Sequence, residues 1–375
     1  MDCLNQRAIR SAELVLVLLL LLCLPFRQAV SQSSETDTAT KVRFGGFLDA
    51  YYAFDFNRPR LHDRAFTTQA ARHNEFNVNL AFIDASLSGP RLRGRVAVQF
   101  GTSVQANYAS EPDIGVVSGS DVSRFLQEAV VGYKLTPHLW IDAGVFLSSF
   151  GSENWTSRDN WTYTRSLVAE NSPYYESGVK ATWQVSKLLS AQVHLINGWQ
   201  NVSENNSDKA IGARVDYAPS TKVNLSYDAF IGNEVPDSAN TSTRIWQEGI
   251  LTLLPGSRIQ IRGTVDYGIQ HDQSVGSSSW WGYSLIGRYT VSRKLNAAIR
   301  TEHYADKNQI IIATNLPYGF RASGWSVNAD FEPVPRLLWR LEFRELDSRS
   351  PVFPAAKGNL ARRDRMAVGS VALTF

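Results

Sequence analysis

The sequence has little cysteine and little net charge, and both absences exclude classes of function. Its two cysteines, Cys3 and Cys23, lie near the start of the 375 residues, so a chain that loses this region keeps no thiol for disulfides, thiolate catalysis or metal binding. The formal net charge of +3 falls to about +2 without residues 1–31, which carry three arginines and two acids. This is not the basic surplus of a nucleic-acid-binding protein, and no nucleic-acid partner is expected.

Long hydrophobic runs are lacking as well. The unbroken apolar stretch at residues 14–24 covers about eleven positions, whereas a membrane-spanning helix needs ~20. Two arginines precede this stretch and the small residues Ala29 and Ser31 follow it, which predicts a signal peptide at residues 1–31 with cleavage near Gln32. An uncleaved membrane anchor is the alternative, and the shortness of the stretch argues against it.

The rest of the chain alternates apolar and polar residues. In residues 91–102 the even positions hold Leu, Gly, Val, Val and Phe, and the odd positions hold three arginines followed by Ala and Gln. Residues 221–231 and 258–270 repeat this period of two. The pattern predicts strands with one apolar face and one polar face.

The connections between these strands alternate in length. Short turns are expected near residues 89–90, 136–138, 186–187, 219–221, 255–257, 292–294 and 333–335. Longer polar stretches lie near residues 57–73, 103–122, 148–173, 201–208, 232–243, 271–279, 305–321 and 347–363. A soluble sandwich has no reason to segregate loop lengths in this way. The pattern therefore predicts an all-β fold, a transmembrane antiparallel β-barrel of about 16 strands with short periplasmic turns and longer extracellular loops. We expect a short N-terminal segment at residues 32–43 and the barrel at residues 44–375.

Aromatic residues and the C-terminus agree with a barrel in the bacterial outer membrane. Aromatic side chains near the short turns would form a girdle at the membrane interface: Tyr133, Trp140, Trp183, Tyr217, Tyr289, Phe331 and Trp339. The last strand alternates up to a terminal Phe375, which resembles the signal that the outer-membrane assembly machinery recognises. Outer-membrane lipids, lipopolysaccharide and this machinery are the expected partners.

Two segments carry a family resemblance. The first is GGFLDAYYAFDFNRP at residues 45–59. The second runs from FG at 150–151 through NWTYTRS at 160–166 to PYYESG at 173–178. Together they resemble the OmpL-like family of β-barrel porins of Gram-negative bacteria. Membership would imply an outer-membrane pore, and it would supply neither catalytic residues nor a defined solute.

The predicted strand phases place a set of basic side chains on the lumen face. Sixteen strands enclose more space than side chains can fill, so the lumen should hold water. The basic set is Arg93, Arg95, Arg214, Arg258, Arg262, Arg300, Arg340 and Arg344. Rings of one charge sign set ion selectivity in pores, so these residues could form a stripe that favours anions. The alternative is a mixed lumen in which acids on the same face balance the arginines.

The stretch at residues 148–173 is long and aromatic for an exposed loop. Its candidate constriction residues are Glu153, Trp155, Asp159, Trp161, Tyr163 and Arg165. The loop could fold inward and narrow the pore, or its aromatic residues could only pack it against the barrel wall.

The sequence thus predicts an exported outer-membrane porin, a channel for passive diffusion of small hydrophilic solutes or ions. A plugged structural or adhesive barrel is an alternative, and a barrel enzyme is a weaker one because the histidines lie outside any recognisable hydrolase motif. No cofactor or metal is expected. A homotrimer is suggested only by analogy with barrels of this size.

Overall fold

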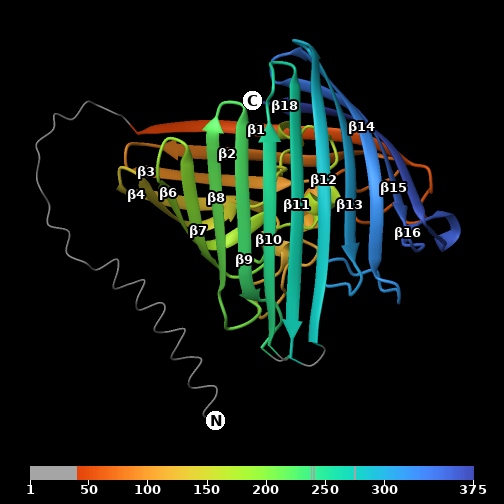
Figure 1. The fold of residues 1–375 in the computed structure, drawn as a ribbon, viewed down its shortest axis with the longest axis horizontal. Coiled ribbons are helices and arrows are strands. Elements are labelled where there is room, and N and C mark those ends of the chain that lie inside the picture. Colours follow the sequence, from red (N-terminus) through yellow and green to blue (C-terminus); the bar gives the residue numbers. More distant parts are fainter. Residues whose placement is uncertain (1–39, 238, 240, 274–275) are drawn as a thin grey trace, which may run out of the picture. The chain divides into compact units, whose positions relative to one another are not determined.

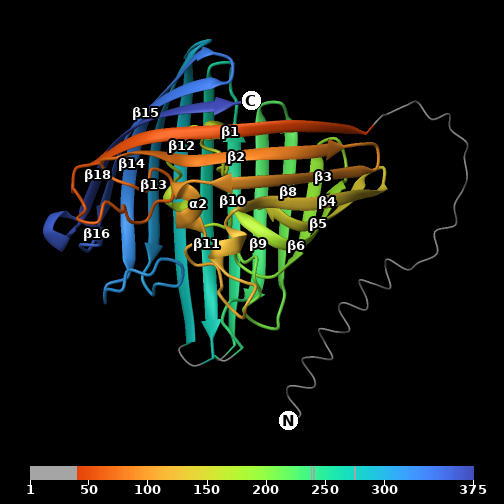
Figure 2. The same cartoon turned by 180° about the vertical axis from the view of Figure 1, so that it is seen from behind.

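The computed structural model describes residues 40–237, 239, 241–273 and 276–375, and the predicted signal peptide lies outside this part of the chain. Sixteen strands form one closed antiparallel barrel, in which each strand pairs with its neighbour along the chain and β18 pairs with both β15 and β1. The walls are steeply inclined to one another, so that β8–β12 and β1–β3 cross on opposite sides of the barrel (Figures 1 and 2). The predicted fold class is confirmed.

Fifteen of the sixteen barrel strands have the roughly nine or more residues that a tilted strand needs to cross a membrane, and β7 has 8. They are β1 (Lys41–Asp55), β2 (Phe76–Ser88), β3 (Leu92–Phe100), β4 (Leu126–Thr136), β5 (Leu139–Leu147), β6 (Tyr175–Gln184), β7 (Leu189–Ile196), β8 (Ala210–Ser220), β9 (Val223–Asn233), β10 (Ser242–Leu253), β11 (Ile259–Asp272), β12 (Gly276–Ser292), β13 (Leu295–Asp306), β14 (Phe320–Val334), β15 (Leu337–Ser348) and β18 (Arg363–Thr374). The first strand therefore begins at Lys41, three residues before the expected start of the barrel.

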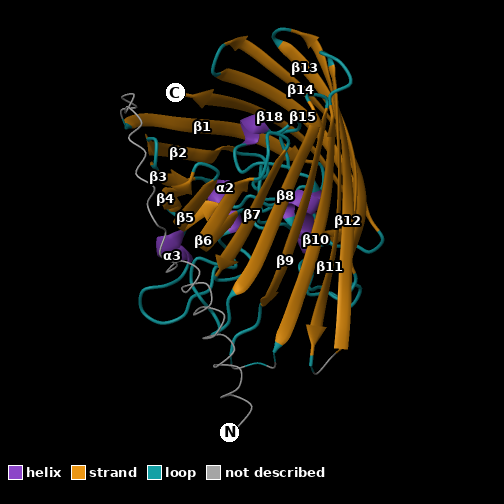
Figure 3. Cartoon of the chain, turned by 60° about the vertical axis from the view of Figure 1, so that its left-hand side comes forward, coloured by secondary structure: helices purple, strands orange, loops and turns teal. Residues whose placement is uncertain are grey.

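Smaller elements lie in the connections. These are helices α2 (Thr102–Asn107), α3 (Ser120–Ser123) and α4 (Leu167–Glu170), the 3-10 turns η1 (Ser157–Asp159) and η2 (Ala356–Gly358), and a separate hairpin of β16 (Phe353–Pro354) and β17 (Leu360–Ala361). Helix α2 lies between the β1–β6 wall and the β8–β12 wall in Figure 3. Among the described residues, no helix is long and apolar enough to cross a membrane.

Short and long connections alternate as predicted, with one exception. Turns such as 137–138, 221–222 and 293–294 close one end of the barrel, and most of the connections at the other end are long. The exception is the expected long loop at 271–279. There β11 continues to Asp272 and β12 begins at Gly276, with a paired ladder between the two strands. This prediction was wrong. Residues that are polar on both faces of a strand are as compatible with a hairpin that extends into water as they are with a loop.

The two faces of the strands differ as the period of two requires. On β3, Val96 and Val98 are 56% and 47% exposed on the outer surface, while Arg93 and Arg95 point inward and pair with acids. Six of the seven expected girdle aromatics are likewise exposed on the outer surface near the short turns. The exception is Trp140, which points inward with Arg93 stacked on its ring.

The barrel closes where β1 meets β18. The backbone N–H and C=O of Phe375 each bond to the backbone of Gly46 at 3.1 Å. The Phe375 ring also covers Gly46, since a Cβ built there would lie 2.3 Å from the ring. An aromatic ring that covers a glycine of the neighbouring strand shields its backbone and fixes the register of the pair. The terminal residue therefore takes part in closing the barrel.

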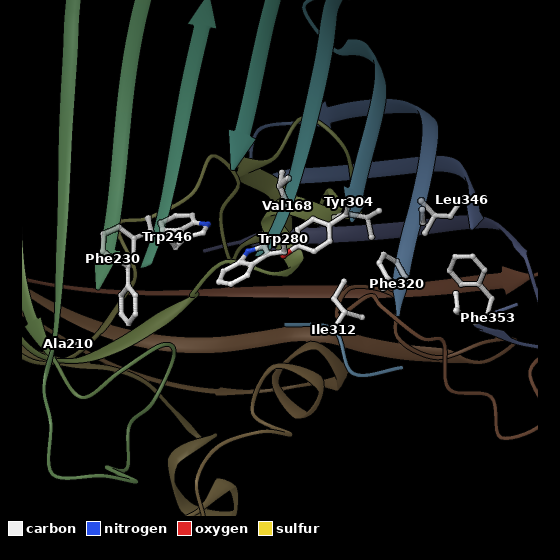
Figure 4. Close-up of a cluster of buried hydrophobic side chains, with 14 of the residues drawn as sticks. Val168, Ala210, Phe230, Trp246, Trp280, Tyr304, Ile312, Phe320, Leu346 and Phe353 are labelled. Carbon is white, nitrogen blue, oxygen red and sulfur yellow. The ribbon is translucent and has the colours of Figure 1, made fainter. Parts of the chain in front are cut away.

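The interior at the long-loop end is apolar rather than watery. A cluster of buried side chains from facing strands and loops fills it, and most of these residues are labelled in Figure 4: Val168, Ala210, Phe230, Trp246, Trp280, Tyr304, Ile312, Phe320, Leu346 and Phe353. A second cluster packs α2 and the β5–β6 connection against β1 and β2.

Candidate functional site

The connection between β5 and β6 folds into the barrel. We call residues 148–174 the inward loop; it contains η1 and α4. Five of the six candidate constriction residues are buried within it, namely Glu153, Trp155, Trp161, Tyr163 and Arg165, while Asp159 is exposed. The structure thus places the loop inside the lumen, rather than over its mouth.

The first part of the inward loop is tied to β8, β9 and β11. The Gly151 N–H donates to Asp228 Oδ2 at 3.0 Å. Arg214 Nη1 donates to the Ser149 carbonyl at 2.6 Å, and Arg262 Nη1 donates to the Ser152 carbonyl at 2.6 Å. Hydrogen bonds that involve an ionised group are the strong ones in proteins, and here they grip backbone groups that a buried loop must satisfy.

The middle of the loop is held by β13 and β15 across the lumen. The backbone N–H and the hydroxyl of Thr164 donate to Glu342 at 2.6 and 2.9 Å. Arg300 donates to the Thr164 carbonyl at 2.5 Å and forms an ion pair with Glu342 at 3.2 Å. Arg340 donates to the carbonyls of Ser157 and Asn160 while its guanidinium pairs with an acid on β14. The loop therefore bridges strands that lie on different sides of the barrel.

Helix α4 places the last part of the loop against the wall. The Ser166 hydroxyl caps the helix by accepting from the Ala169 N–H at 3.4 Å, and the Leu167 N–H donates to Glu302 on β13 at 2.8 Å. An N-cap of this kind satisfies one of the free donors of the first turn. Two of the free donors of the first turn thus have side-chain partners inside the barrel.

Two glycines in the wall make room for the loop. A Cβ built at Gly212 on β8 would lie 2.4 Å from the Phe150 ring, and one built at Gly282 on β12 would lie 2.7 Å from Val168. Phe150 also stacks on the His194 ring, with the ring centroids 5.0 Å apart. These close approaches explain why residues without side chains occur at inward-facing positions of these two strands.

The predicted basic stripe is largely paired with acids. Arg93 pairs with Asp142, Arg95 with Asp84 and Glu128, Arg214 with Asp216 and Asp228, Arg300 with Glu302 and Glu342, Arg340 with Asp330, and Arg344 with Glu302. Arg262 holds the inward loop and stacks over Trp161 at 4.5 Å. Arg258 lies in the turn before β11, where it is exposed and outside the lumen wall.

Acids were expected on the lumen face, but alternation does not assign the arginine with which each one pairs. Asp228, Glu302 and Glu342 form these pairs, and all three share the inward phase of their strands. Within the loop, burial raises the pKa of Glu153, while Arg300 and the hydrogen bond from the Ser166 N–H oppose this shift. The loop therefore carries a carboxyl whose charge depends on the surrounding arginines.

Among the described residues, two cavities lie along the lumen wall, and the larger of the two also borders the inward loop. The larger one, of about 450 Å³, lies next to residues 147–156 and is lined by wall residues such as Arg214, Asp216 and Asn224. The smaller one, of about 300 Å³, is lined by Arg93, Lys180 and other residues of β3–β7. Gln192 lines both cavities. The wall residues of the larger cavity belong to the short-turn halves of their strands, so the free space faces that end of the barrel.

A closed antiparallel barrel of sixteen strands, with an apolar outer surface and a charged, partly hollow interior, defines an outer-membrane porin. Such a protein is a channel for passive diffusion of small hydrophilic solutes. The chain belongs to the family described as "Putative beta-barrel porin-2, OmpL-like", whose model matches residues 41–375. The resemblance carried by residues 45–59 and 150–178 is thereby confirmed.

Solved structures of other outer-membrane proteins share the fold. The anion-selective porin from Comamonas acidovorans has a TM-score of 0.59 at 10% identity, covering 90% of this chain and 100% of that chain. The outer membrane channel DcaP of Acinetobacter baumannii has a TM-score of 0.60 at 12% identity, covering 90% and 97%. The trimer form of OmpT of Vibrio cholerae has a TM-score of 0.58 at 11% identity, covering 90% and 100%. At these identities the likeness concerns the fold. A comparison with curated proteins gives no match.

Proposed function

We propose that solutes cross this porin along the wall formed by β3–β11 and that the inward loop sets the size limit. The observation that carries this proposal is the loop itself, which hydrogen-bonds to wall strands on different sides of the lumen, while two cavities of the described part of the barrel lie on the β3–β11 side. Apolar side chains fill much of the rest of the long-loop half. A loop held at both ends by charged groups narrows the passage without closing the side where the cavities lie.

The ion preference follows from the pairing of the arginines. A stripe of unpaired arginines would favour anions. Here most of the predicted stripe faces carboxylates at ion-pair distance, which cancels much of its field. We therefore favour a mixed lumen over an anion-selective stripe, and the arginines act chiefly as anchors of the inward loop.

The enzyme alternative finds little support at the histidine best placed for it. His194 Nδ1 lies 2.6 Å from Glu176, which is half of a hydrolytic arrangement. Its other ring nitrogen faces Gln192 at 3.2 Å rather than a serine, and the ring is fully buried against Phe150. His194 thus helps to position the loop, and we propose that the protein is a channel without enzymatic activity.

Export and assembly complete the proposal. We infer that residues 1–31 direct export and are removed, that the assembly machinery reads the last strand, and that the apolar outer surface contacts membrane lipids with lipopolysaccharide around the long loops. A homotrimer is supported by the trimer form of OmpT of Vibrio cholerae, whose fold is similar.

Planar-bilayer recording of the refolded protein tests the channel. Discrete open-channel steps in potassium chloride are expected, and a small reversal potential in an asymmetric salt gradient would agree with a mixed lumen. A strongly anion-selective reversal potential would favour the stripe instead. Insertion without any conductance steps would show a plugged barrel and contradict the proposal.

A further inference from the structure

Three carboxylates lie side by side on the lumen wall. Glu248 on β10 is directly opposite Asp228 on β9 and directly opposite Asp266 on β11, and all three are at most 1% exposed. Residues opposite each other on one face of a sheet have Cβ atoms about 4.5–5.5 Å apart, and like charges in such positions are destabilising. We call these three residues the acidic row.

The acidic row is not neutralised by the side chains around it. Asp228 pairs with Arg214 at 3.1 Å, and Asp266 accepts one hydrogen bond from the Trp246 indole at 3.3 Å. In the part of the chain that the structure describes, both carboxylate oxygens of Glu248 lack a hydrogen-bond partner. The second carboxylate oxygen of Asp266 lacks one as well. Glu153 of the inward loop is a further acidic neighbour of Glu248, and Arg214 is the basic group that faces Glu248. A buried polar group without a partner requires an explanation such as a bound ion or water.

Aromatic side chains stand beside the row. Trp246 is two residues from Glu248 on β10. Trp280 on β12 lies opposite Gly268, which is two residues from Asp266 on β11. The ring of Tyr304, labelled in Figure 4, covers Gly282 on β12, and Gly282 is directly opposite Asp266 on β11. The hydroxyl of Tyr304 and the indole N–H of Trp280 also lack partners among the described residues. Aromatic faces attract cations, and they do so more strongly when water is excluded.

The acidic row lies close to the larger cavity, although none of its three carboxylates lines that cavity. Ile250, two residues from Glu248 toward the short turns, lines this cavity together with Gly151, Glu153 and Arg214. The row therefore lies two positions along β10 from a residue that borders the free space.

We propose that the acidic row binds the ammonium group of a small organic cation during its passage, an inference that rests on the proposed channel function. An ammonium group supplies three N–H donors, which match the unpartnered oxygens of Glu248 and Asp266, and its alkyl part suits the adjoining indoles. A tightly coordinated metal fits less well, because no group of three or more His, Asp or Glu side chains among the described residues is arranged to hold one.

Calorimetry tests the site independently of conduction. Butylammonium chloride is titrated into the full barrel refolded in detergent, with butanol as the uncharged control ligand. The double variant Glu248→Gln, Asp266→Asn removes the charge of the row at nearly constant volume. Glu345→Gln is the matched control. It changes a carboxylate that pairs with arginines near the long-loop end of β15.

Butylammonium is expected to bind the wild type and Glu345→Gln equally, and the double variant at least tenfold more weakly, while butanol binds none of them. Glu248→Gln alone is expected to weaken binding in part and to raise the midpoint of thermal unfolding, which shows that the variant is folded. Equal affinity of the wild type and the double variant would overturn the proposal, as would equal binding of butanol. Channel steps recorded on the same samples decide the porin function separately, because a plugged barrel could still bind butylammonium.

Discussion

Replacing Arg340 by alanine should release the inward loop without unfolding the barrel. The guanidinium donates to the carbonyls of Ser157 and Asn160 in the loop, and it pairs with Asp330 at 2.8 Å. The alanine side chain leaves all three groups without this partner. The backbone ladder between β14 and β15, which closes the barrel at this point, does not involve the side chain and remains.

The size of the effect follows from these contacts. Hydrogen bonds to a charged group contribute about 1.5–3 kcal/mol each, and breaking a buried ion pair on one side costs about 3–5 kcal/mol. Part of the cost is recovered because Asn328 Nδ2 still donates to Asp330 at 2.6 Å. We therefore expect loop docking to weaken by about 3–5 kcal/mol, which raises the population of the released loop roughly 10²–10⁴-fold.

Two measurements report the release. Single-channel recordings should show a larger or noisier conductance, because the released loop no longer narrows the passage. In an Ala169→Cys background, a membrane-impermeant thiol reagent should label the buried helix α4 faster when Arg340 is absent. The predicted mature chain offers this label no competing cysteine. Arg340→Lys keeps the charge but loses the planar fork, so it should give an intermediate result.

Arg363→Ala is the matched control, because Arg363 pairs with Asp347 at 2.9 Å where both side chains are more than half exposed. Exposed pairs of this kind contribute little, so this variant should match the wild type in conductance and labelling. If Arg340→Ala also matched the wild type in both measurements, the arginine anchors would not hold the loop, and the reasoning from buried charge would be refuted.

Three further predictions concern other parts of the molecule. Deletion of Phe375 should leave export intact but reduce the amount of heat-modifiable barrel on gels, and a normal amount would show that neither closure nor assembly needs this residue. Gly212→Val should displace the Phe150 ring and increase current noise relative to the outward-facing change Ala213→Val, and equal noise would contradict the docking role of Gly212. Burial raises the pKa of Glu234 to about 7 in the folded protein. Protonation of Glu234 therefore stabilises the fold, and this stabilisation is complete below about pH 4.5 and is lost as the pH rises through 7. Glu234→Gln should therefore unfold at a higher temperature than the wild type at pH 8 and at a similar temperature at pH 4.5, and no difference at pH 8 would contradict the raised pKa.

The strand count could be predicted because outward-facing strand positions within the membrane contact lipid and are therefore mostly apolar. Residues 91–102 and 258–270 alternate so clearly that parity alone assigns their faces. The rule ends where the strands leave the membrane. Residues 276–279 are glycine and serines, and they read as a loop although they pair with β11. Arg258 was misplaced for the same reason, since a position at the edge of a turn keeps the parity of the strand but not its surroundings.

The inward loop shows which part of the site is hidden from sequence. Its aromatic content indicates burial, and this is why residues 148–173 drew attention. Its partners could not be named, because Glu342 and Arg300 are more than 130 positions away along the chain and meet the loop only once the register of every intervening strand is set. Parity places these residues on the inner face, but it does not say which of them share a level of the barrel.

The interior apolar cluster explains why the loop and the barrel should respond differently to mutation. Trp246, Trp280 and Tyr304 belong to the wall, whereas Phe150 and Val168 belong to the loop, and these side chains pack together. Alternation cannot reveal such a layer, since both faces of the strands are apolar at that level. Apolar contacts are non-directional, so they tolerate small shifts, whereas the arginine and carboxylate anchors require fixed geometry. Loss of one anchor should therefore loosen the loop locally, while the cluster still fills much of the long-loop half of the barrel and directs solutes to the side on which the cavities lie.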